Sequence, residues 1–366
     1  MNARGRRLAL GLAACTAAVA CTGSPVVITP SRAPTTTAGT TAAPEPPSFT
    51  LAAGGDILVH PALTEQADQD GARDFTPLLE GLRQAIDADV SICHLETPLS
   101  APGAPTFGYP AFSAPPEVAT ALRNIGYDSC STASNHTLDR GPSAIATTLD
   151  VLDAAGLEHT GSFRSPEESA TPLLLDAKGV KVGHVAFTYG FNGIPLDQPW
   201  RANQLSVEGV LTAARAARAA GAEVVVASLH WGDEYRHEAT PQQRDMARAI
   251  LGDPAVDLII GTHVHAVQPI ERIGDKWVVY GMGNEAARHS EPRGITEEGI
   301  VTRFRFVKTD AGWTVRDASY VPTLVEFGPP IRVVDLTRVP TSPRRTEALT
   351  RTDGVVRSLG ADITHP

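Results

Sequence analysis

The feature that most limits the fold of this chain is a repeated alternation of strand-like and helix-like segments, with polar motifs directly after the strands. The strand patterns comprise residues 49–53, 88–93, 127–132, 223–229 and 256–260. The helical patterns comprise residues 77–86, 116–126, 143–155, 207–220 and 242–251. Such alternation is typical of an α/β sheet with a ligand crevice along the carboxyl ends of its strands. We therefore expect an α/β fold, finished by antiparallel strands at residues 300–307, 313–319 and 331–336.

The motif Gly-Thr-His263-Val-His265 follows the last of the five buried strand patterns. In an extended backbone residues two apart project to the same side, so both imidazoles can converge on one small volume. Imidazole is a common ligand of zinc and other first-row transition metals. Taken alone, so short a motif also fits two solvent-exposed loop histidines, and it gains weight only from the similar motifs elsewhere in the chain.

Carboxylates, an amide and a further imidazole follow other strand patterns. Asp56 comes after a Gly-Gly pair, where it could also cap the following segment. The full set of candidate metal ligands is Asp56, Glu96, Asn135, His230, His263 and His265. One mononuclear site needs only three or four protein ligands, so these candidates predict two divalent metal ions that share a bridging carboxylate. Mixed nitrogen and oxygen ligands leave Mn, Zn, Fe and Mg open.

The candidate catalytic residues are His136 and Asp139. His136 directly follows Asn135, and Asp139 lies three residues further on. If residues 137–139 begin a helix, Asp139 can accept a hydrogen bond from the imidazole and raise its basicity. His136 would then protonate the leaving group of a displacement at phosphorus, for which a metal pair activates the water. The alternative is a capped helix with an incidental histidine.

Charge and the N-terminal segment bear on partners and location. The formal net charge of -10 argues against a nucleic-acid groove, which needs a basic face, so we expect no nucleic-acid partner.

Residues 1–21 have the basic start and apolar run of a secretion signal. Cys21 fits a lipobox and leaves a longer apolar run than Cys15, so we expect export and a lipid anchor on Cys21 at the outer face of the cytoplasmic membrane. Cleavage with release into the medium is the alternative.

Between the signal segment and the first strand, residues 22–48 consist mostly of Thr, Ala, Pro and Ser. Such a composition cannot offset its own ordering entropy, so we expect a disordered tether.

Two further cysteines, Cys93 and Cys130, precede candidate site residues at the ends of strands that could be neighbours. They fit either a disulfide or two buried thiols, and only their separation in space distinguishes these.

The motifs together resemble the CapA family of poly-γ-glutamate capsule biosynthesis proteins, whose fold is similar to that of calcineurin-like metallophosphoesterases. The resemblance covers residues 49–327 through Gly-Asp56-Ile-Leu, His94-Leu-Glu96, Asn135-His136-Thr-Leu-Asp139, Tyr189-Gly-Phe-Asn192, His230-Trp-Gly-Asp-Glu234-Tyr235 and His263-Val-His265-Ala-Val-Gln268. It implies a four-layer α/β/β/α sandwich of the metallophosphoesterase type over residues 49–330, followed by a C-terminal extension, 331–366.

The same resemblance assigns the ligands to two metals. It places Asp56, Glu96 and His265 around one metal, and Glu96, Asn135, His230 and His263 around the other, with Glu96 as the bridge and His136 as the acid. Metallophosphoesterases usually carry Asp-x-His in the first motif, whereas this chain has Leu58 at the histidine position. Either His60 replaces it or the first metal is held weakly. The Gly-Asn284-Glu-Ala motif also lacks the usual aromatic residue, which affects the pocket wall.

Two functions follow. The first is a metal-dependent hydrolase acting on a phosphoester or a cell-envelope polymer, favoured by the Asn135-His136-Asp139 set, which pure binding does not need. The second is a non-catalytic accessory protein for export or anchoring of an anionic capsule polymer such as poly-γ-glutamate, favoured by the family name and the missing histidine. A net charge of -10 suits a polyanion poorly unless metals or a local basic patch hold it. We favour the hydrolase.

Overall fold

The structure, a computed structural model, describes residues 18, 20, 23–24, 45–69, 71–290 and 293–366. Nearly all of the predicted signal segment and of the predicted tether lie outside these residues, as do Cys15 and Cys21, so the lipid anchor stays a prediction. Residues 46–366 form one compact unit, which carries everything that follows. Within the described ranges, no helix has the length and apolar character needed to cross a membrane.

The first of two large sheets holds eight strands in the order β16-β15-β14-β1-β4-β5-β6, with β13 paired to β1. Its parallel part comprises β1 (Ser48–Leu58), β4 (Val90–Leu95), β5 (Ser129–Ser131), β6 (Glu158–Thr160) and β13 (Asn284–Ala287). Its antiparallel part comprises β14 (Glu298–Thr309), β15 (Gly312–Glu326) and β16 (Arg332–Asp335). The three antiparallel strands predicted after the parallel part are thus confirmed, and the predicted C-terminal extension contributes β16 to the sheet edge.

The second large sheet has six strands in the order β11-β12-β10-β9-β8-β7. Its strands are β7 (Leu173–Ala177), β8 (Val180–Thr188), β9 (Val224–His230), β10 (Leu258–Thr262), β11 (Ile270–Ile273) and β12 (Lys276–Val279). Strands β8, β9, β10 and β12 run parallel, so their carboxyl ends meet at one edge. A separate two-stranded sheet joins β2 (Asp68–Gln69) to β3 (Ala72–Arg73).

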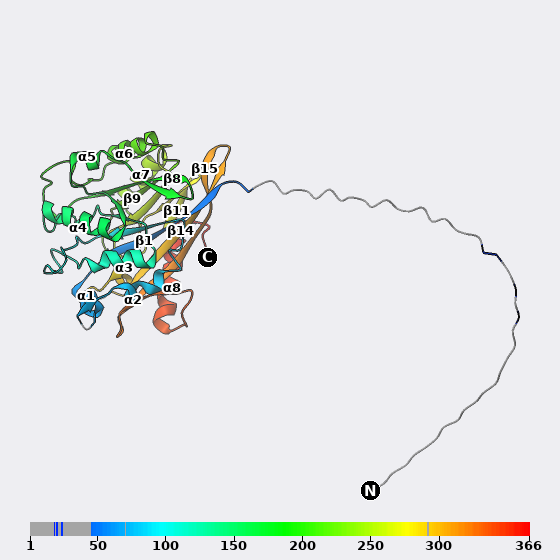
Figure 1. The fold of residues 1–366 in the computed structure, drawn as a ribbon, viewed down its shortest axis with the longest axis horizontal. Helices are drawn as coiled ribbons and strands as arrows, with labels where there is room; N and C mark the ends of the chain where they lie inside the picture. Colours follow the sequence, from blue (N-terminus) through cyan, green and yellow to red (C-terminus); the bar gives the residue numbers. More distant parts are fainter. Residues whose placement is uncertain (1–17, 19, 21–22, 25–44, 70, 291–292) are drawn as a thin grey trace, which may run out of the picture. The chain divides into compact units, whose positions relative to one another are not determined.

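Helices cover the outer face of each large sheet (Figure 1). On the first sheet lie α3 (Glu117–Ile125) and α4 (Pro142–Ala155), and on the second lie α6 (Val207–Ala219) and α7 (Pro241–Leu251). The remaining helices are α1 (Pro61–Ala67), α2 (Thr76–Leu79), α5 (Pro166–Ser169) and α8 (Pro343–Val356), with short 3-10 turns η1 (Glu80–Leu82) and η2 (Ile295–Glu297). The predicted four-layer α/β/β/α sandwich is confirmed.

Side-chain alternation along the strands explains why the two sheets stack. On β9, Val224 and Val226 face the core between the sheets, whereas Val225 and Ala227 face the helices α6 and α7. Because successive residues of a strand point to opposite faces, a continuous apolar run fits only a strand that is buried on both sides. Each buried Val contributes roughly 1.5–3 kcal/mol relative to an exposed one. The uninterrupted apolar runs in the sequence therefore determine the central position of this strand.

Helix ends place the loops that follow. Thr240 begins α7 with a capping box, in which its side chain accepts a hydrogen bond from the Gln243 backbone and the Gln243 side chain accepts one from the Thr240 backbone. At the other end of α3, Gly126 has a left-handed φ of 119°, which a residue with a Cβ adopts only with strain.

One predicted helix is wrong. The pattern at 77–86 yields only the four residues of α2 and the 3-10 turn η1. Gly81 lies so close to the backbone of Val333 on β16 that a Cβ there would overlap its carbonyl oxygen. The chain here therefore packs against a strand that is distant in sequence, where a side chain at position 81 would not fit. The helices α1 and α8 were not predicted.

Candidate metal centre

The carboxyl ends of the strands β1, β4, β9 and β10 bring the predicted donors together. Asp56 lies in register between His94 of β4 and Asn284 of β13. The Gly-Gly pair before it permits this close approach, because a Cβ at Gly54 would overlap the carboxylate of Glu285 and one at Gly55 would overlap a backbone oxygen. Asp56 also accepts a hydrogen bond from the backbone N–H of His263, at 3.1 Å.

His263 and His265 converge, but for a different reason than the predicted extended backbone. Strand β10 ends at Thr262, and the two histidines have left-handed φ values of 97° and 54°. A residue with a Cβ rarely adopts this conformation, and such strain tends to occur at functional sites. The two rings lie 6.1 Å apart. A sharp turn, held by contacts from other strands, aims both imidazoles into the site.

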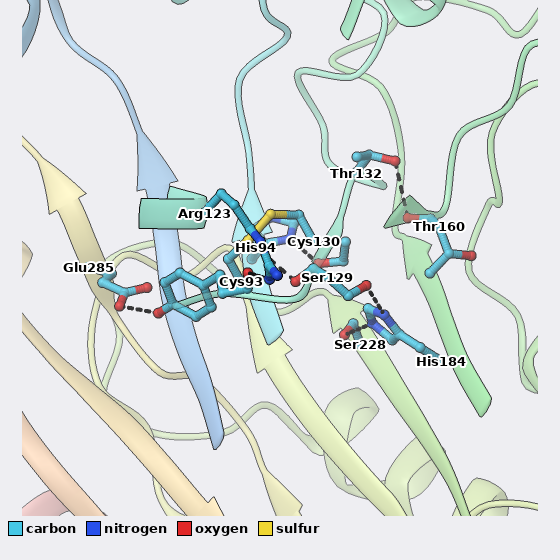
Figure 2. The surroundings of a disulfide bond; sticks show 12 residues. Cys93, His94, Arg123, Ser129, Cys130, Thr132, Thr160, His184, Ser228 and Glu285 are labelled. Atoms are coloured by element: carbon cyan, nitrogen blue, oxygen red, sulfur yellow. Dashed lines mark hydrogen bonds between the residues drawn. A yellow bond between two sulfur atoms is a disulfide. The ribbon is translucent and has the colours of Figure 1, made fainter. Parts of the chain in front are cut away.

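A disulfide between Cys93 and Cys130 joins β4 to β5, as Figure 2 shows. The two residues are direct register partners, with a Cα–Cα distance of 4.5 Å. Of the two alternatives that the sequence left open, the disulfide is therefore the one formed. It ties together the strands that lead into Glu96 and into the loop containing Asn135.

That loop is also bonded to Glu96 directly. The hydroxyl of Ser134 donates to the backbone oxygen of Glu96 at 2.6 Å, and the backbone N–H of His136 donates to the Ser134 hydroxyl at 3.0 Å. Residues 135–140 form turns rather than the start of a helix. Ser134 therefore fixes the position of the candidate acid relative to the candidate bridge.

Four groups of three side chains have ligand atoms within 4.8 Å of one another. The groups are Asp56, His94 and His230; Glu96, His230 and His263; Glu234, His263 and His265; and Asp56, Glu96 and His265. Five of the six predicted ligands appear in these groups. The sixth, Asn135, places its Oδ1 atom 2.9 Å from Nε2 of His230. The structure thus brings all six predicted ligands into one cluster.

His94 and Glu234 also belong to these groups, although neither was predicted as a ligand. The sequence did contain a signal for His94, which precedes Glu96 by two residues at the end of a strand and so shares its side. Conversely, His60 belongs to none of the four groups, which were searched among the described residues. Its Nδ1 atom lies 3.0 Å from the backbone oxygen of Leu58 and 3.2 Å from the backbone nitrogen of Arg288.

Unpaired buried atoms test whether this cluster fits metal ions. Within the described part of the chain, both carboxylate oxygens of Glu96, Nε2 of His94 and Nδ1 of His263 are buried without a hydrogen-bond partner. Such unpaired atoms are costly in a folded protein. His265 stands 3.7 Å from Glu96, too far for a hydrogen bond. Two ligand atoms that are each about 2.1 Å from a tetrahedral zinc lie roughly 3.4 Å apart. The separation of His265 and Glu96 is close to this value, so the donor set fits bound cations.

Burial controls the protonation of the cluster. It lowers the pKa of His94 to about 4 and that of His263 to about 3, so both imidazoles are neutral and able to ligate. Burial likewise raises the pKa of Glu96 well above its usual range. Burial also favours the neutral form of His265, but the carboxylates of Glu96 and Asp56 outweigh it and raise the His265 pKa to about 10. The buried carboxylates attract positive charge, which a divalent cation supplies more strongly than a proton.

The two predicted catalytic residues form a hydrogen-bonded pair. Nδ1 of His136 lies 2.7 Å from a carboxylate oxygen of Asp139, which also accepts from the backbone N–H of Phe112 at 2.6 Å. The ring of Phe112 meets that of His136 edge-on, with centroids 4.8 Å apart. Burial first, and then the neighbouring imidazoles of the cluster, lower the pKa of His230 and of His263. This arrangement leaves Nε2 of His136 as the atom that can exchange a proton.

Exposed apolar side chains lie on two loops beside the cluster. The four in the described residues are Phe107, Tyr109, Tyr189 and Ile194. Tyr189 is 44% exposed and packs against His263, with ring centroids 4.5 Å apart. Tyr109 is 82% exposed and faces Phe112 at 6.5 Å. A cavity of about 640 Å³ lies elsewhere, between β15, β16 and Arg344, and none of the candidate ligands lines it.

Comparison with known proteins gives a family match and several relatives. A family model described as "Bacterial capsule synthesis protein PGA_cap" matches residues 50–288. The capsule biosynthesis protein CapA of Bacillus anthracis is 24% identical over 223 residues, which cover 60% of this chain and 53% of that protein. The PGA biosynthesis protein CapA of Bacillus subtilis is 26% identical, with 54% and 51% covered. The chain spans about half the length of these curated relatives.

The chain is also similar to a named accessory protein and to two solved structures. A probable polyglutamine synthesis accessory protein of Mycobacterium tuberculosis is 26% identical over 54% of this chain and 55% of its own length. The calcineurin-like phosphoesterase YfkN of Bacillus subtilis covers 85% of this chain and 97% of its own, at 15% identity and a TM-score of 0.45. A phosphatase of Mycoplasma pneumoniae covers 82% and 97%, at 13% identity and a TM-score of 0.47.

Proposed function

Because the chain belongs to the bacterial capsule synthesis protein family PGA_cap, we propose that it serves capsule-polymer metabolism as a dinuclear metal-dependent hydrolase. The bond it cleaves is a phosphoester or a linkage in a cell-envelope polymer. One observation carries this proposal. The buried donor cluster, with its unpaired carboxylate and imidazole atoms, adjoins a hydrogen-bonded His136–Asp139 pair that a binding site does not require.

The donors would hold two cations, with Glu96 shared between them. Asp56, Glu96 and His265 would hold one, and Glu96, Asn135, His230 and His263 would hold the other. When bound, a pair of divalent cations supplies an activated water and neutralises charge on the phosphoryl oxygens. The mixed ligand set leaves the identity of the metal open among Mn, Zn, Fe and Mg.

Proton transfer is the task of His136. Asp139 accepts the Nδ1 hydrogen, which fixes the tautomer and orients the ring. In its protonated form His136 donates the Nε2 proton to the departing oxygen, while the entering water supplies the hydroxyl group on phosphorus. One phosphoester bond breaks, one P–O bond forms, and the water proton leaves to solvent. Such general-acid assistance contributes typically 10²–10⁴-fold to the rate.

Metal content and turnover of the full chain test this proposal. The probe is bis(p-nitrophenyl) phosphate, with Mn²⁺, Zn²⁺ or Mg²⁺ added to chelator-treated protein. We expect two metals per chain, fewer in Glu96→Ala, and a turnover reduced at least about 100-fold in His136→Ala with its metal content unchanged. His159→Ala is the matched control, because it removes another His–Asp pair, with Asp153, outside the cluster.

The competing function is that of a non-catalytic accessory protein. The mycobacterial relative is named a probable polyglutamine synthesis accessory protein. In that case the full chain binds poly-γ-glutamate in a metal-dependent manner and turns over no phosphoester. If the full chain neither binds metal nor hydrolyses the phosphoester, the hydrolase proposal is wrong. Binding of the polymer without metal is then the remaining alternative.

A further inference from the structure

We propose that His94 is an additional metal ligand of this centre and supplies a second imidazole to the first metal site. This inference rests on the proposed function and extends it. The site of Asp56, Glu96 and His265 has a single imidazole, and the side chain of Leu58 cannot add one. Leu58 instead packs with Phe112 and Ala287 in a small apolar cluster.

The position of His94 meets the requirements for a ligand. It lies on β4, is 2% exposed, and directly faces Asp56 in the register of the sheet. Its Nε2 atom is 3.8 Å from Oδ1 of Asp56 and has no hydrogen-bond partner in the described residues. The His94 and His230 rings lie 4.8 Å apart, and with Asp56 they make one of the four donor groups.

The other ring nitrogen of His94 is already engaged. Nδ1 lies 2.7 Å from the hydroxyl oxygen of Ser131 on β5. When Nδ1 donates its hydrogen to Ser131, Nε2 carries a bare lone pair directed at Asp56. Metal-bound histidines generally donate the second ring N–H to such a partner, which fixes the tautomer. The disulfide at the preceding residues Cys93 and Cys130 holds the two strands in the register that this bond requires.

A second buried histidine, His184 on β8 of the second sheet, shows what a purely structural imidazole looks like in this fold. His184 contacts Ser129, which lies two residues before Ser131 on β5. Figure 2 shows His184 and Ser129. Its Nδ1 is 3.1 Å from the Ser129 hydroxyl and its Nε2 is 2.8 Å from the Ser228 hydroxyl. Both nitrogens of His184 therefore have partners. His94 has a serine at one nitrogen only, and its other nitrogen faces the metal centre.

This contrast provides a matched pair of variants. His94→Leu and His184→Leu each remove one buried imidazole and replace it with a side chain of similar volume. Zinc is titrated into the chelator-treated full chain, and the number of sites and each Kd are measured by calorimetry. We expect His94→Leu to weaken one of two sites by more than about 100-fold, since the loss of a mere outer-shell partner already costs roughly 10–100-fold. His184→Leu should keep both sites.

A measurement on the unmutated chain covers the case in which a variant does not fold. Nitrogen NMR of the histidine rings counts how many of them shift when zinc is added. The inference expects four ligating histidines, His94, His230, His263 and His265, rather than three.

The outcomes separate this inference from the proposed function. If the unmutated chain binds no metal, the proposed function fails, and this inference fails with it. If it binds two metals with three ligating histidines, or if the two leucine variants lose zinc equally, His94 is not a ligand while the dinuclear centre stands.

Discussion

Breaking the Cys93–Cys130 disulfide should lower the stability of the domain by an amount that follows from its place in the chain. The bond closes a loop with a sequence separation of 37 residues. In the chain-entropy treatment, closing a loop of this length removes about 13 cal/mol/K from the unfolded chain. At 25 °C that entropy corresponds to about 4 kcal/mol. The folded chain loses this advantage when the bond is reduced or replaced.

Two perturbations separate loop entropy from packing. Reduction by a phosphine leaves every heavy atom of the two buried side chains in place, so it isolates the entropic part. The double variant Cys93→Ala/Cys130→Ala also empties space within the apolar core between the first sheet and its helices. We expect the double variant to be less stable than the reduced chain by about 1 kcal/mol or more, since core truncation leaves a cavity.

The assay is urea unfolding followed by tryptophan fluorescence, because Trp231 and Trp277 are buried in the fold. Midpoint and slope are recorded for the oxidised chain, the reduced chain and the double variant. The reasoning is refuted if reduction changes the free energy of unfolding by less than about 1 kcal/mol. It is refuted equally if thiol titration of the unfolded, unreduced chain finds all four cysteines free.

Three further predictions concern the metals, a glycine and a buried acid. Divalent metal at about 1,000 times its Kd should raise the free energy of unfolding by about 4 kcal/mol per site, and a chelator should reverse this, as urea unfolding can check. Gly55→Ala should lower the free energy of unfolding by about 3 kcal/mol, because its Cβ would overlap the Gly283 backbone oxygen. The control is Gly190→Ala, where no atom lies within 4 Å of the added Cβ, and it should change stability by less than about 0.5 kcal/mol in the same assay. In metal-free protein, burial raises the pKa of Glu285 to about 8 from the ordinary 4.5, so between these pH values the folded chain holds one more proton than the unfolded chain. The contribution of Glu285 to stability should therefore fall by about 1.4 kcal/mol per pH unit as the pH rises from 5 to 8. It is measured as the difference in the free energy of unfolding between the unmutated chain and Glu285→Gln, and parallel pH profiles of the two proteins would contradict the assignment.

Much of the fold could be predicted because it depends on local patterns. The apolar run that forms β9 and the capped pattern that forms α7 encode their own periodicity and ends, independent of the rest of the chain. The helix predicted at 77–86 was wrong for the converse reason. There the chain packs at Gly81 against the backbone of Val333, more than 200 residues away, and no local pattern contains that contact.

The candidate ligands could also be chosen from the sequence, because a parallel sheet gathers whatever follows its strands at one edge. The geometry of the cluster could not be predicted from the sequence. His263 and His265 converge through left-handed backbone that only distant contacts stabilise, including the hydrogen bond from His263 to Asp56, 207 residues away. The pairing of Cys93 with Cys130 depends likewise on the register of two strands.

By itself the sequence determined the kind of sheet and the six residues that follow its strands, since these properties repeat within short stretches of chain, whereas the four layers came from the family resemblance. Only the tertiary structure decided that His94 lies open to Asp56 while His184 is satisfied by two serines. Both histidines stand in buried strands and have a serine hydroxyl at Nδ1. What distinguishes them is a second hydroxyl, from Ser228, at Nε2 of His184, and strand register sets that distance.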